Sequence, residues 1–423
     1  MTTDPQRPSA TALGYTLGVL VVVYTLNFID RQIFAILLPS LQAELNLNDT
    51  WGGFLGGTAF ALFYATLGIP IAWLADRSNR RNLIAWALAI WSAMTALCGL
   101  AQNVWQLSLA RIGVGVGEAG CSPPAHSLLA DYFPPERRGT ALSIYSLGIP
   151  LGIMFGLFAG GWLDEFFGWR TAFLVVGLPG LVVALLVRFT LKEPRRGQAD
   201  GNVSVTAPAG IAATFAYLRR RRAFVHLSFG AALAALAGYS IANWLPAFLV
   251  RSHAMGSAEI GTVLGLIFGI AGGAGIFLGG FLADRLGARD TRWRLWVATV
   301  AFVGAAPFFF LTFLSESKTL ALLGLCIPML LSNFYQATSF AQTQNLAPVA
   351  MRSTAAAMLL FVINIIGLGI GPLASGYASD LLTPRFGDDA LRFVLVAMVF
   401  VYLWSAWHFF IAGRHLRGDL PTS

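Results

Sequence analysis

The chain has 423 residues, of which 57% are hydrophobic and only 11% are charged. Soluble domains average about 25% charged residues, and a water-soluble core of this size would split into domains or expose large apolar patches. The composition therefore excludes an ordinary soluble protein. Apolar stretches are unbroken over helical lengths, whereas the strands of a membrane barrel alternate apolar and polar residues. We therefore expect an all-α, polytopic membrane protein.

Charge and cysteine content exclude further classes. The net charge of +8 needs no nucleic-acid partner, because the chain offers no soluble domain to bind one and membrane orientation accounts for excess Lys and Arg. Cys98, Cys121 and Cys326 fall in apolar stretches without pair spacing, so neither a disulfide framework nor a metal site is indicated. A phosphate-binding Walker loop is missing from the sequence, so ATP hydrolysis is not the motor. We expect no metal and no cofactor.

Twelve membrane-spanning helices are predicted, because each needs about 20 mostly apolar residues between polar or Gly/Pro-rich breaks. In the first half they are Leu13 to Pro39, Gly52 to Leu74, Asn82 to Ala101, Val104 to Ala130, Gly139 to Leu163, and Thr171 to Leu191. In the second half they are Ala223 to Val250, Ala258 to Ala283, Leu295 to Leu314, Thr319 to Ala347, Thr354 to Leu382, and Ala390 to Gly413.

The spans define three parts: a six-helix bundle over 1–191, a linker over 192–222 and a second six-helix bundle over 223–423. The linker ends in Arg219, Arg220, Arg221 and Arg222, which is typical of an interfacial helix lying on anionic headgroups. Most Lys and Arg residues fall in loops on the side of both termini. The positive-inside rule therefore predicts cytoplasmic termini and a cytoplasmic linker, in the cell (inner) membrane.

Four charged residues lie deep in the predicted spans: Asp30 and Arg31 in the first helix, Arg111 and Glu118 in the fourth. Each costs about 2.5 to 3.5 kcal/mol at the membrane centre, so they must face a cavity or one another. Arg111 and Glu118 share one face but stand about 10 Å apart along the axis. Asp30 with Arg111, and Arg31 with Glu118, are feasible pairs between the two helices.

Purely structural salt bridges are one interpretation, but buried ion pairs often add little over apolar packing. Burial and a neighbouring arginine act in opposite senses on a carboxyl group. Moving the arginine away, or engaging it with an anionic substrate, would let the carboxylate gain a proton. We therefore predict that Asp30 and Glu118 serve proton coupling. Arg31 and Arg111 are the predicted counter-ions or binders of a substrate head.

A loop signature occurs twice, about half a chain length apart. Ala72-x-x-x-Asp76-Arg77-x-x-Arg80-Arg81 follows the second helix, and Gly280-x-x-x-Asp284-Arg285-x-Gly287-x-Arg289 follows the eighth. A parallel repeat of six helices is typical of two-bundle transporters, and at this point the chain resembles the major facilitator superfamily. Ala72 and Asn79 depart from the usual glycines. We interpret Asp76, Arg77, Arg80, Arg81, Asp284 and Arg285 as a conformational latch, with the arginines reaching the headgroups.

Glycines spaced by four residues favour close approach of two helix backbones in lipid. They recur at Gly148, Gly152, Gly156 and Gly160 and at Gly261, Gly265, Gly269 and Gly273, with shorter versions at Gly53 and Gly57 and at Gly367 and Gly371. In the superfamily, helices five and eight, and two and eleven, face each other across the bundles. The resemblance therefore implies a bundle seam at Gly152, Gly156, Gly265 and Gly269. Close packing inside one bundle is the alternative.

A more specific resemblance surrounds the buried charges. The sequence reads LNFIDRQ around Asp30, LADRSNRR at Asp76, and RIGVGVGEAGCSPPAHSLLADYFPPERRGTALSIYSLGIPLG from Arg111. These segments resemble the spinster family of proton-linked lysolipid transporters, whose animal members carry the same Asp-Arg pair and the same Arg followed by Gly-Glu-Ala. Gly120 and Cys121 replace the Ser and Tyr of animal members, a departure that concerns the shape of the substrate pocket.

Polar residues in the second half predict the rest of the substrate cavity. Amides and hydroxyls inside a span form interhelical hydrogen bonds or line a solute cavity, and their number on the tenth helix favours the cavity. The candidates are Asn243, Trp244, Asn333, Gln336, Gln342 and Asn364.

These observations predict a proton-coupled secondary transporter that works by alternating access. The resemblance implies lysophospholipid or sphingoid-type cargo moved with protons. We also expect membrane lipid as a partner and a monomeric state. Transport of a small organic anion, such as a sugar acid, is the alternative. A channel would need rings of charge from several subunits, and an enzyme would need a nucleophile or metal constellation that five dispersed histidines do not supply.

Overall fold

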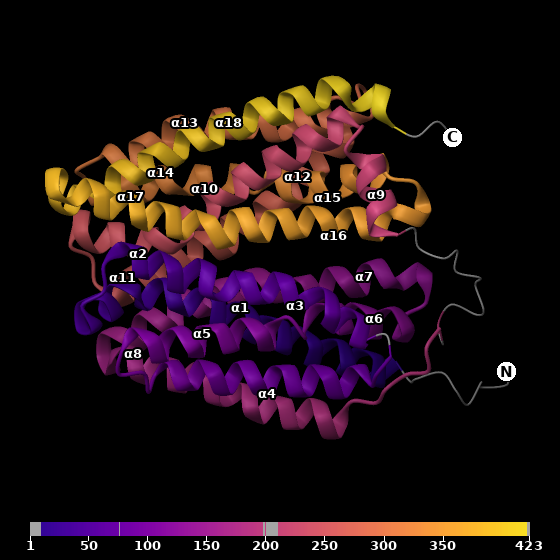
Figure 1. Ribbon diagram of the computed structural model, residues 1–423, viewed down its shortest axis with the longest axis horizontal. Helices are drawn as coiled ribbons and strands as arrows, with labels where there is room; N and C mark the ends of the chain where they lie inside the picture. Colours follow the sequence, from indigo (N-terminus) through magenta and orange to yellow (C-terminus); the bar gives the residue numbers. More distant parts are fainter. Residues whose placement is uncertain (1–9, 76, 198, 200–209, 421–423) are drawn as a thin grey trace. The chain divides into compact units, whose positions relative to one another are not determined.

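The computed structural model describes residues 10–75, 77–197, 199 and 210–420 (Figure 1). These residues form helices, and the described part of the chain contains no strand. Contacts group the chain into two units. Unit 1 comprises Met1–Phe34 and Leu62–Ser204, and unit 2 comprises Ala35–Ala61 and Val205–Ser423. Unit 2 therefore includes a short piece of the first half of the chain, residues 35–61.

The helices of the first half are α1 (Ala10–Leu45), α2 (Asp49–Gly53), the π-helix η1 (Phe54–Thr58), α3 (Ala59–Ala75), α4 (Arg80–Cys98), α5 (Val104–Glu118), α6 (Ser122–Tyr132), α7 (Pro135–Ser146) and α8 (Gly148–Thr190). Those of the second half are α9 (Ile211–Leu218), α10 (Arg222–His253), α11 (Ser257–Leu266), the π-helix η2 (Ile267–Gly272), α12 (Gly273–Gly287), α13 (Trp293–Leu314), α14 (Lys318–Leu331), α15 (Phe334–Leu346), η3 (Val349–Met351), α16 (Arg352–Val362), the π-helix η4 (Ile363–Ile370), α17 (Gly371–Phe386), η5 (Gly387–Asp389) and α18 (Ala390–Asp419).

Eight helical runs of the described chain are long and apolar enough to cross a membrane. Two of them are too long for one crossing. Glu136–Thr190 turns at Gly168, and Val349–Asp419 turns at Gly387, both with the positive φ that glycine tolerates. Each run thus holds two expected spans. The two remaining expected spans are built from α2 to α3 and from α5 to α6, and the all-α, twelve-helix prediction is confirmed.

Local differences from the expected boundaries have physical causes. α1 continues beyond Pro39 to Leu45 because a membrane helix tolerates an internal proline. The expected fourth span is divided between α5 and α6 at residues 119–121, directly before Pro123 and Pro124. A proline fits the first turn of a helix and cannot continue the preceding one. The interruption places Glu118 at the last turn of α5.

Three π-helical segments interrupt the second, eighth and eleventh spans, namely η1, η2 and η4. Such segments are rare and occur often at functional sites. Each contains glycine, whose lack of a side chain permits the widened turn. Nothing in the hydrophobic pattern predicts them, because a π-turn leaves the apolar character of the span unchanged.

Packing within each unit follows the small residues. In unit 1, α4 contacts both α5 and α8. A Cβ on Gly177 of α8 would lie 2.6 Å from the backbone nitrogen of Ala96 in α4, so only glycine allows this approach. In unit 2, α18 packs against both α10 and α13 (Figure 1). The rings of Phe302, Phe309 and Tyr402 stack between α13 and α18.

Large apolar side chains also cover the outside of the helices. Trp86, Phe189 and Phe277 are 68%, 76% and 71% exposed, respectively. A water-soluble protein rarely exposes contiguous apolar surface on this scale. Lipid is the solvent in which such a surface costs nothing, so the helices are membrane-spanning.

Candidate functional site

The four charged residues predicted inside the membrane all belong to unit 1. Asp30 and Arg31 lie near the middle of α1, while Arg111 and Glu118 lie on α5. Asp30, Arg111 and Glu118 are 3%, 2% and 1% exposed, respectively. The cost of burying these groups therefore has to be offset by partners within the unit.

Arg31 and Glu118 form the central ion pair of the site. Arg31 Nε donates to Glu118 Oε2 over 2.6 Å, as the relative depth of the two helices predicts. The same guanidinium lies 4.5 Å from the ring centre of Tyr64 in α3 and 5.0 Å from that of Phe28. Cation–π contact and the ion pair together hold Arg31 at the junction of α1, α3 and α5.

Asp30 has a hydrogen-bond partner that the sequence did not predict. Thr95 Oγ1 of α4 donates to Asp30 Oδ2 over 3.0 Å, and both side chains are buried. The Arg111 guanidinium lies over the ring of Phe34, 4.7 Å from its centre. Pairing of Asp30 with Arg111 stays a prediction. Thr95 was not predicted as a site residue, because one hydroxyl in a span gives no signal of its own.

A glycine on α5 positions the glutamate. A Cβ on Gly117 would lie 2.6 Å from the backbone nitrogen of Trp91 in α4, so α5 approaches α4 only because residue 117 has no side chain. Glu118 follows at the end of α5, where the two prolines of α6 end the helical run. The Gly-Glu order of the sequence thus sets the position of the carboxylate.

Unused hydrogen-bonding capacity surrounds the ion pair. Asn27 lies one turn before Arg31 on α1 and is fully buried. Within the described residues, neither polar atom of its amide makes a hydrogen bond of normal length, and Glu118 Oε1 also lacks one, although the amide lies close enough to act on the Glu118 carboxylate. Leaving buried polar atoms unpaired costs about 1 to 3 kcal/mol each. The arrangement is therefore suited to bind an additional polar group or a proton beside Glu118.

The polar residues predicted to line the cavity are mostly engaged with their own surroundings. Trp244 Nε1 donates to the carbonyl of Pro372 over 2.9 Å, Asn333 Nδ2 to that of Met329 over 2.7 Å, and Gln336 Nε2 to Asn333 Oδ1 over 2.8 Å. Gln342 accepts from Asn345 Nδ2 over 3.4 Å. Asn243 and Asn364 are buried, and Asn243 Nδ2 has no partner within the described residues.

Unit 2 also has an open apolar hollow of about 330 Å³ at its surface, lined by Phe229, Ala232, Leu233, Ile366, Trp404 and His408. Phe229 and Trp404 are 54% and 56% exposed, so the hollow is not an enclosed cavity. None of the predicted cavity residues belongs to this lining. Their role in binding substrate therefore stays a prediction.

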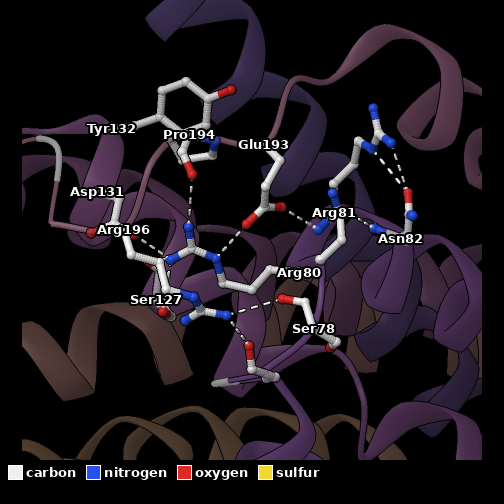
Figure 2. A network of polar contacts seen from close by, with 12 residues as sticks. Ser78, Arg80, Arg81, Asn82, Ser127, Asp131, Tyr132, Glu193, Pro194 and Arg196 are labelled. Atoms are coloured by element: carbon white, nitrogen blue, oxygen red, sulfur yellow. Dashed lines mark hydrogen bonds and ion pairs between the residues drawn. The ribbon is translucent and has the colours of Figure 1, made fainter.

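The first copy of the loop signature forms a buried ionic junction in unit 1 (Figure 2). Arg80 is fully buried and donates through Nε to Glu193 Oε1 over 2.7 Å. Its Nη1 pairs with Asp131 and also donates to Ser127 Oγ over 3.0 Å. The expectation that Arg80 contacts the lipid headgroups is therefore wrong, because Arg80 is buried and pairs with the carboxylates of Asp131 and Glu193. Asp76 lies outside the described residues.

The beginning of the linker joins the same junction. Glu193 Oε2 accepts from the backbone nitrogen of Arg81 over 2.9 Å, and Arg196 Nη2 donates to the carbonyls of Ala75 and Ser78 over 2.6 and 3.0 Å. Asn79 Oδ1 accepts from the backbone nitrogen of Asn82 over 2.9 Å. This N-cap explains why asparagine stands in place of the usual glycine. We name this set of residues around Arg80 the Arg80 junction.

The remaining latch residues lie at the surface. Arg77 is exposed and stacks on Trp73, 4.0 Å from the ring centre. Asp284 and Arg285 are exposed on α12, and neither forms an ion pair with another described residue. Their role as a conformational latch stays a prediction.

The glycines predicted for the bundle seam make close contacts inside unit 1. A Cβ on Gly152 would meet the carbonyl oxygen of Thr25 at 2.5 Å, and one on Gly156 would meet that of Ile29 at 3.0 Å. Both partners belong to α1. Gly152 and Gly156 thus support packing of α8 on α1, and a seam with Gly265 and Gly269 stays a prediction.

Comparison with known proteins agrees with this architecture. Residues 20–372 match the family description of the Major Facilitator Superfamily, so the chain belongs to this superfamily of membrane transporters. It is 36% identical to an MFS-type efflux pump of Mycolicibacterium smegmatis, over 96% of this chain and 93% of that protein. It is 30% identical to human protein spinster homolog 1, over 91% of this chain and 78% of that protein.

Two further relatives narrow the family. Identity to the sphingosine-1-phosphate transporter SPNS2 of Danio rerio is 27%, over 95% of this chain and 84% of that protein. The crystal structure of a bacterial homolog to the human lysosomal transporter spinster, inward-facing and unoccupied, matches with a TM-score of 0.90 and 31% identity, over 98% of this chain and 100% of that one. The chain belongs to the spinster family and is a multi-pass membrane transporter.

Proposed function

We propose that the chain is a proton-coupled secondary transporter that moves lysophospholipid or sphingoid-type lipids by alternating access. The observation that carries the proposal is the buried Arg31–Glu118 ion pair of 2.6 Å, with Asp30 beside it on α1. Four charged side chains inside a membrane bundle are costly, and a transport pathway is their usual reason.

The chemistry of coupling follows from the two possible partners of Arg31. An anionic head that binds the guanidinium competes with Glu118 for the same donors. A buried carboxylate that loses its cation takes up a proton rather than remain charged. The unpaired Glu118 Oε1 and the Asn27 amide supply the polar surroundings for that proton. Arg111 and Asp30 extend the charged region along α5 and α1.

The proposed cargo has a charged head and a long apolar chain. Arg31 and Arg111 suit a phosphate or carboxylate head, and Asn243, Asn333, Gln336, Gln342, Asn364 and Trp244 are the proposed lining in the second half. A named relative of this chain is a sphingosine-1-phosphate transporter, which supports this class of cargo. Small organic anions such as sugar acids are the competing class, since they need only the arginines.

The proposed architecture places bundles over 1–191 and 223–423 on either side of a linker over 192–222. We propose cytoplasmic termini, an inner-membrane location and a monomer. Asp76, Arg77, Asp284 and Arg285 would stabilise one arrangement of the bundles, and Gly152, Gly156, Gly265 and Gly269 would lie at their seam. Channel and enzyme functions lack a comparable supporting observation.

Purified protein in liposomes with an imposed pH gradient tests the coupling. Labelled lysolipid should move faster with the gradient, and Asp30→Asn or Glu118→Gln should abolish that acceleration while binding persists. Glu165→Gln, an exposed carboxylate of the same unit, serves as the matched control. A normal response to the gradient in both core variants would refute proton coupling through these residues.

A homologous series of lysolipids tests the cargo. Each buried methylene contributes about 0.8 kcal/mol, so four more carbons should tighten competition roughly a hundredfold until the cavity is full. Sugar acids have no tail and gain nothing from apolar walls. Competition that is flat with chain length, together with strong competition by sugar acids, would favour the small-anion alternative.

A further inference from the structure

A second cluster of charged residues lies outside the membrane-buried site, at the start of α2 in unit 2. Arg251 of α10 binds both carboxylate oxygens of Asp49: Nη2 donates to Oδ1 over 2.6 Å and Nη1 to Oδ2 over 2.8 Å. Gln42 Nε2 donates to Oδ1 over 2.7 Å, and Ser379 Oγ of α17 donates to Oδ2 over 2.6 Å. Asp49 is only 3% exposed, so four donors replace its water.

The neighbouring acid, Asp380, binds the amino end of α2. Its Oδ1 accepts from the backbone nitrogen of Asp49 over 3.0 Å, and its Oδ2 accepts from that of Thr50 over 2.8 Å. Thr50 Oγ1 adds a third bond of 2.5 Å. A carboxylate from α17 thus satisfies free N–H groups of a helix from the other half of the chain. We name Gln42, Asp49, Arg251, Ser379 and Asp380 the outer clamp.

Below the clamp, backbones of the two halves of the chain touch. A Cβ on Gly53 would lie 2.2 Å from the carbonyl oxygen of Pro372, one on Gly57 would lie 2.5 Å from that of Leu368, and one on Gly376 would lie 2.1 Å from that of Asp49. Thr58 Oγ1 donates to the carbonyl of Gly369 over 2.6 Å. Within unit 2, the beginning of the second span therefore faces the eleventh span at residues 368–376, as the superfamily resemblance implies.

The charges around the clamp keep Asp49 ionised. Burial acts to raise the pKa of Asp49, but the hydrogen bonds and positive charge of Arg251, together with the bonds from Ser379 and Gln42, lower it below its ordinary value. The carboxylates of Asp380 and Asp388 also act on Arg251, and both stabilise its charged guanidinium. The cluster is held by a full ion pair at neutral pH.

We propose that the outer clamp closes the membrane face opposite the termini and must release before the transporter opens there. The inference rests on the proposed alternating access. If residues 1–191 and 223–423 move as two bodies, every bond from Gln42, Asp49 and Thr50 to Arg251, Ser379 and Asp380 breaks in the outward-open state. The clamp is thus an ionic gate that sets the population of that state.

The test measures distances between spin labels at Gln102→Cys and Glu316→Cys, which lie in exposed loops of the same predicted face. Cys98, Cys121 and Cys326 are replaced by alanine. Asp49→Asn should raise the ratio of open to closed populations about tenfold or more, because it removes a charge from several hydrogen bonds. Arg251→Gln should act in the same direction, and it decides the outcome if Asp49→Asn does not fold.

The matched control is Glu259→Gln. Glu259 pairs with Lys318 over 2.8 Å on the same predicted face, but the pair is exposed and both residues belong to the second half. It should leave the distances unchanged. The reversed pair, Asp49→Arg with Arg251→Asp, should restore part of the closed population.

Identical distance distributions in the unsubstituted protein, in Asp49→Asn and in Arg251→Gln would overturn the clamp. The readout needs neither a pH gradient nor a lipid substrate. An open face in the variants without proton-driven lipid flux would sustain the clamp while refuting the proposed cargo or coupling. Proton-driven lipid flux with unchanged distances would refute the clamp while supporting the proposed cargo and coupling.

Discussion

The Arg80 junction in unit 1 and the outer clamp in unit 2 are both buried ionic clusters, but they are built in opposite ways. The junction surrounds one cation with two carboxylates, Asp131 and Glu193 (Figure 2). The clamp surrounds one carboxylate, Asp49, with one cation and neutral donors. In each, the buried ion has enough partners to offset the loss of water.

The two clusters differ in which parts of the chain they join. The junction connects residues 75 and 78–82 with residues 127–132 and 191–197, all from the first half and the beginning of the linker. The clamp connects residues 42–50 with residue 251 and residues 379–380 of the second half. Under the proposed alternating access, movement of one half against the other would leave the junction intact and break the clamp. We interpret the first as a permanent staple and the second as a gate.

The two copies of the loop signature also differ in whether they bury a cation. Asp284 and Arg285 match Asp76 and Arg77 in register, but the position that matches Arg80 is Ala288. The second copy therefore has no cation to bury, and Ala288 is exposed. Two loops of similar sequence therefore form different structures. The first forms the Arg80 junction, which joins three segments of the chain, and the second forms the solvated end of α12.

Replacing Arg80 by alanine should have the largest effect on stability. Buried Asp131 and half-buried Glu193 would lose their shared cation, and breaking a buried ion pair typically costs about 3 to 5 kcal/mol. The measurement is thermal unfolding in detergent, followed by tryptophan fluorescence. Arg289→Ala removes an exposed arginine of the second copy and should change stability by less than about 0.5 kcal/mol. Equal effects of the two changes would contradict the staple.

Glu193→Gln should increase local opening at the beginning of the linker more than it lowers the stability of the whole protein. The amide keeps the shape but weakens two bonds, to Arg80 Nε and to the backbone nitrogen of Arg81. Charge-assisted bonds contribute about 1.5 to 3 kcal/mol each, so local opening should increase tenfold or more. Trypsin should then cleave faster after Arg195 and Arg196. Glu136→Gln, an exposed acid of α7, should leave the cleavage rate unchanged.

The fold was predictable from the sequence because membrane burial leaves a strong signal. Apolar runs of spanning length defined all twelve helices, and the cost of charge in lipid pointed to Arg31 and Glu118. Spans two and four were found by composition although the structure interrupts each of them, at Phe54–Thr58 and at residues 119–121.

The parts that the sequence did not predict depend on contacts distant along the chain. Asp49 looks like an ordinary loop acid after Asn48, and nothing local indicates that Arg251 and Ser379 reach it. Thr95 and Asn27 are single polar residues in apolar runs, which give no periodic signal. Arg80 was expected at the headgroups because its two carboxylate partners lie about 50 and 110 residues further along the chain.

Acid should weaken the outer clamp in a defined direction. The folded-state pKa of Asp49 lies below its ordinary value of 3.8, so the carboxylate contributes stability above that pH, and the contribution is lost as the pH falls through the lowered pKa. The difference in melting temperature between the unsubstituted protein and Asp49→Asn should therefore be constant from about pH 5 to 8 and shrink in stronger acid. If the difference in melting temperature instead changes between pH 6 and 8, a group other than Asp49 would control the pH dependence of the clamp.

The smallest effect is expected where an arginine is added to the second loop. Ala288→Arg restores the full signature in sequence, but the described structure offers residue 288 an exposed position at the end of α12. An arginine there stays solvated, because no pair of buried carboxylates waits for it, and exposed charges contribute about 0 to 1 kcal/mol. The free energy of unfolding should change by less than about 0.5 kcal/mol in Ala288→Arg. The double variant, Arg80→Ala with Ala288→Arg, should be as unstable as Arg80→Ala alone. If the added arginine rescues the loss of Arg80, a cation near either loop suffices. The buried geometry of Asp131 and Glu193 would then not be what distinguishes the two copies.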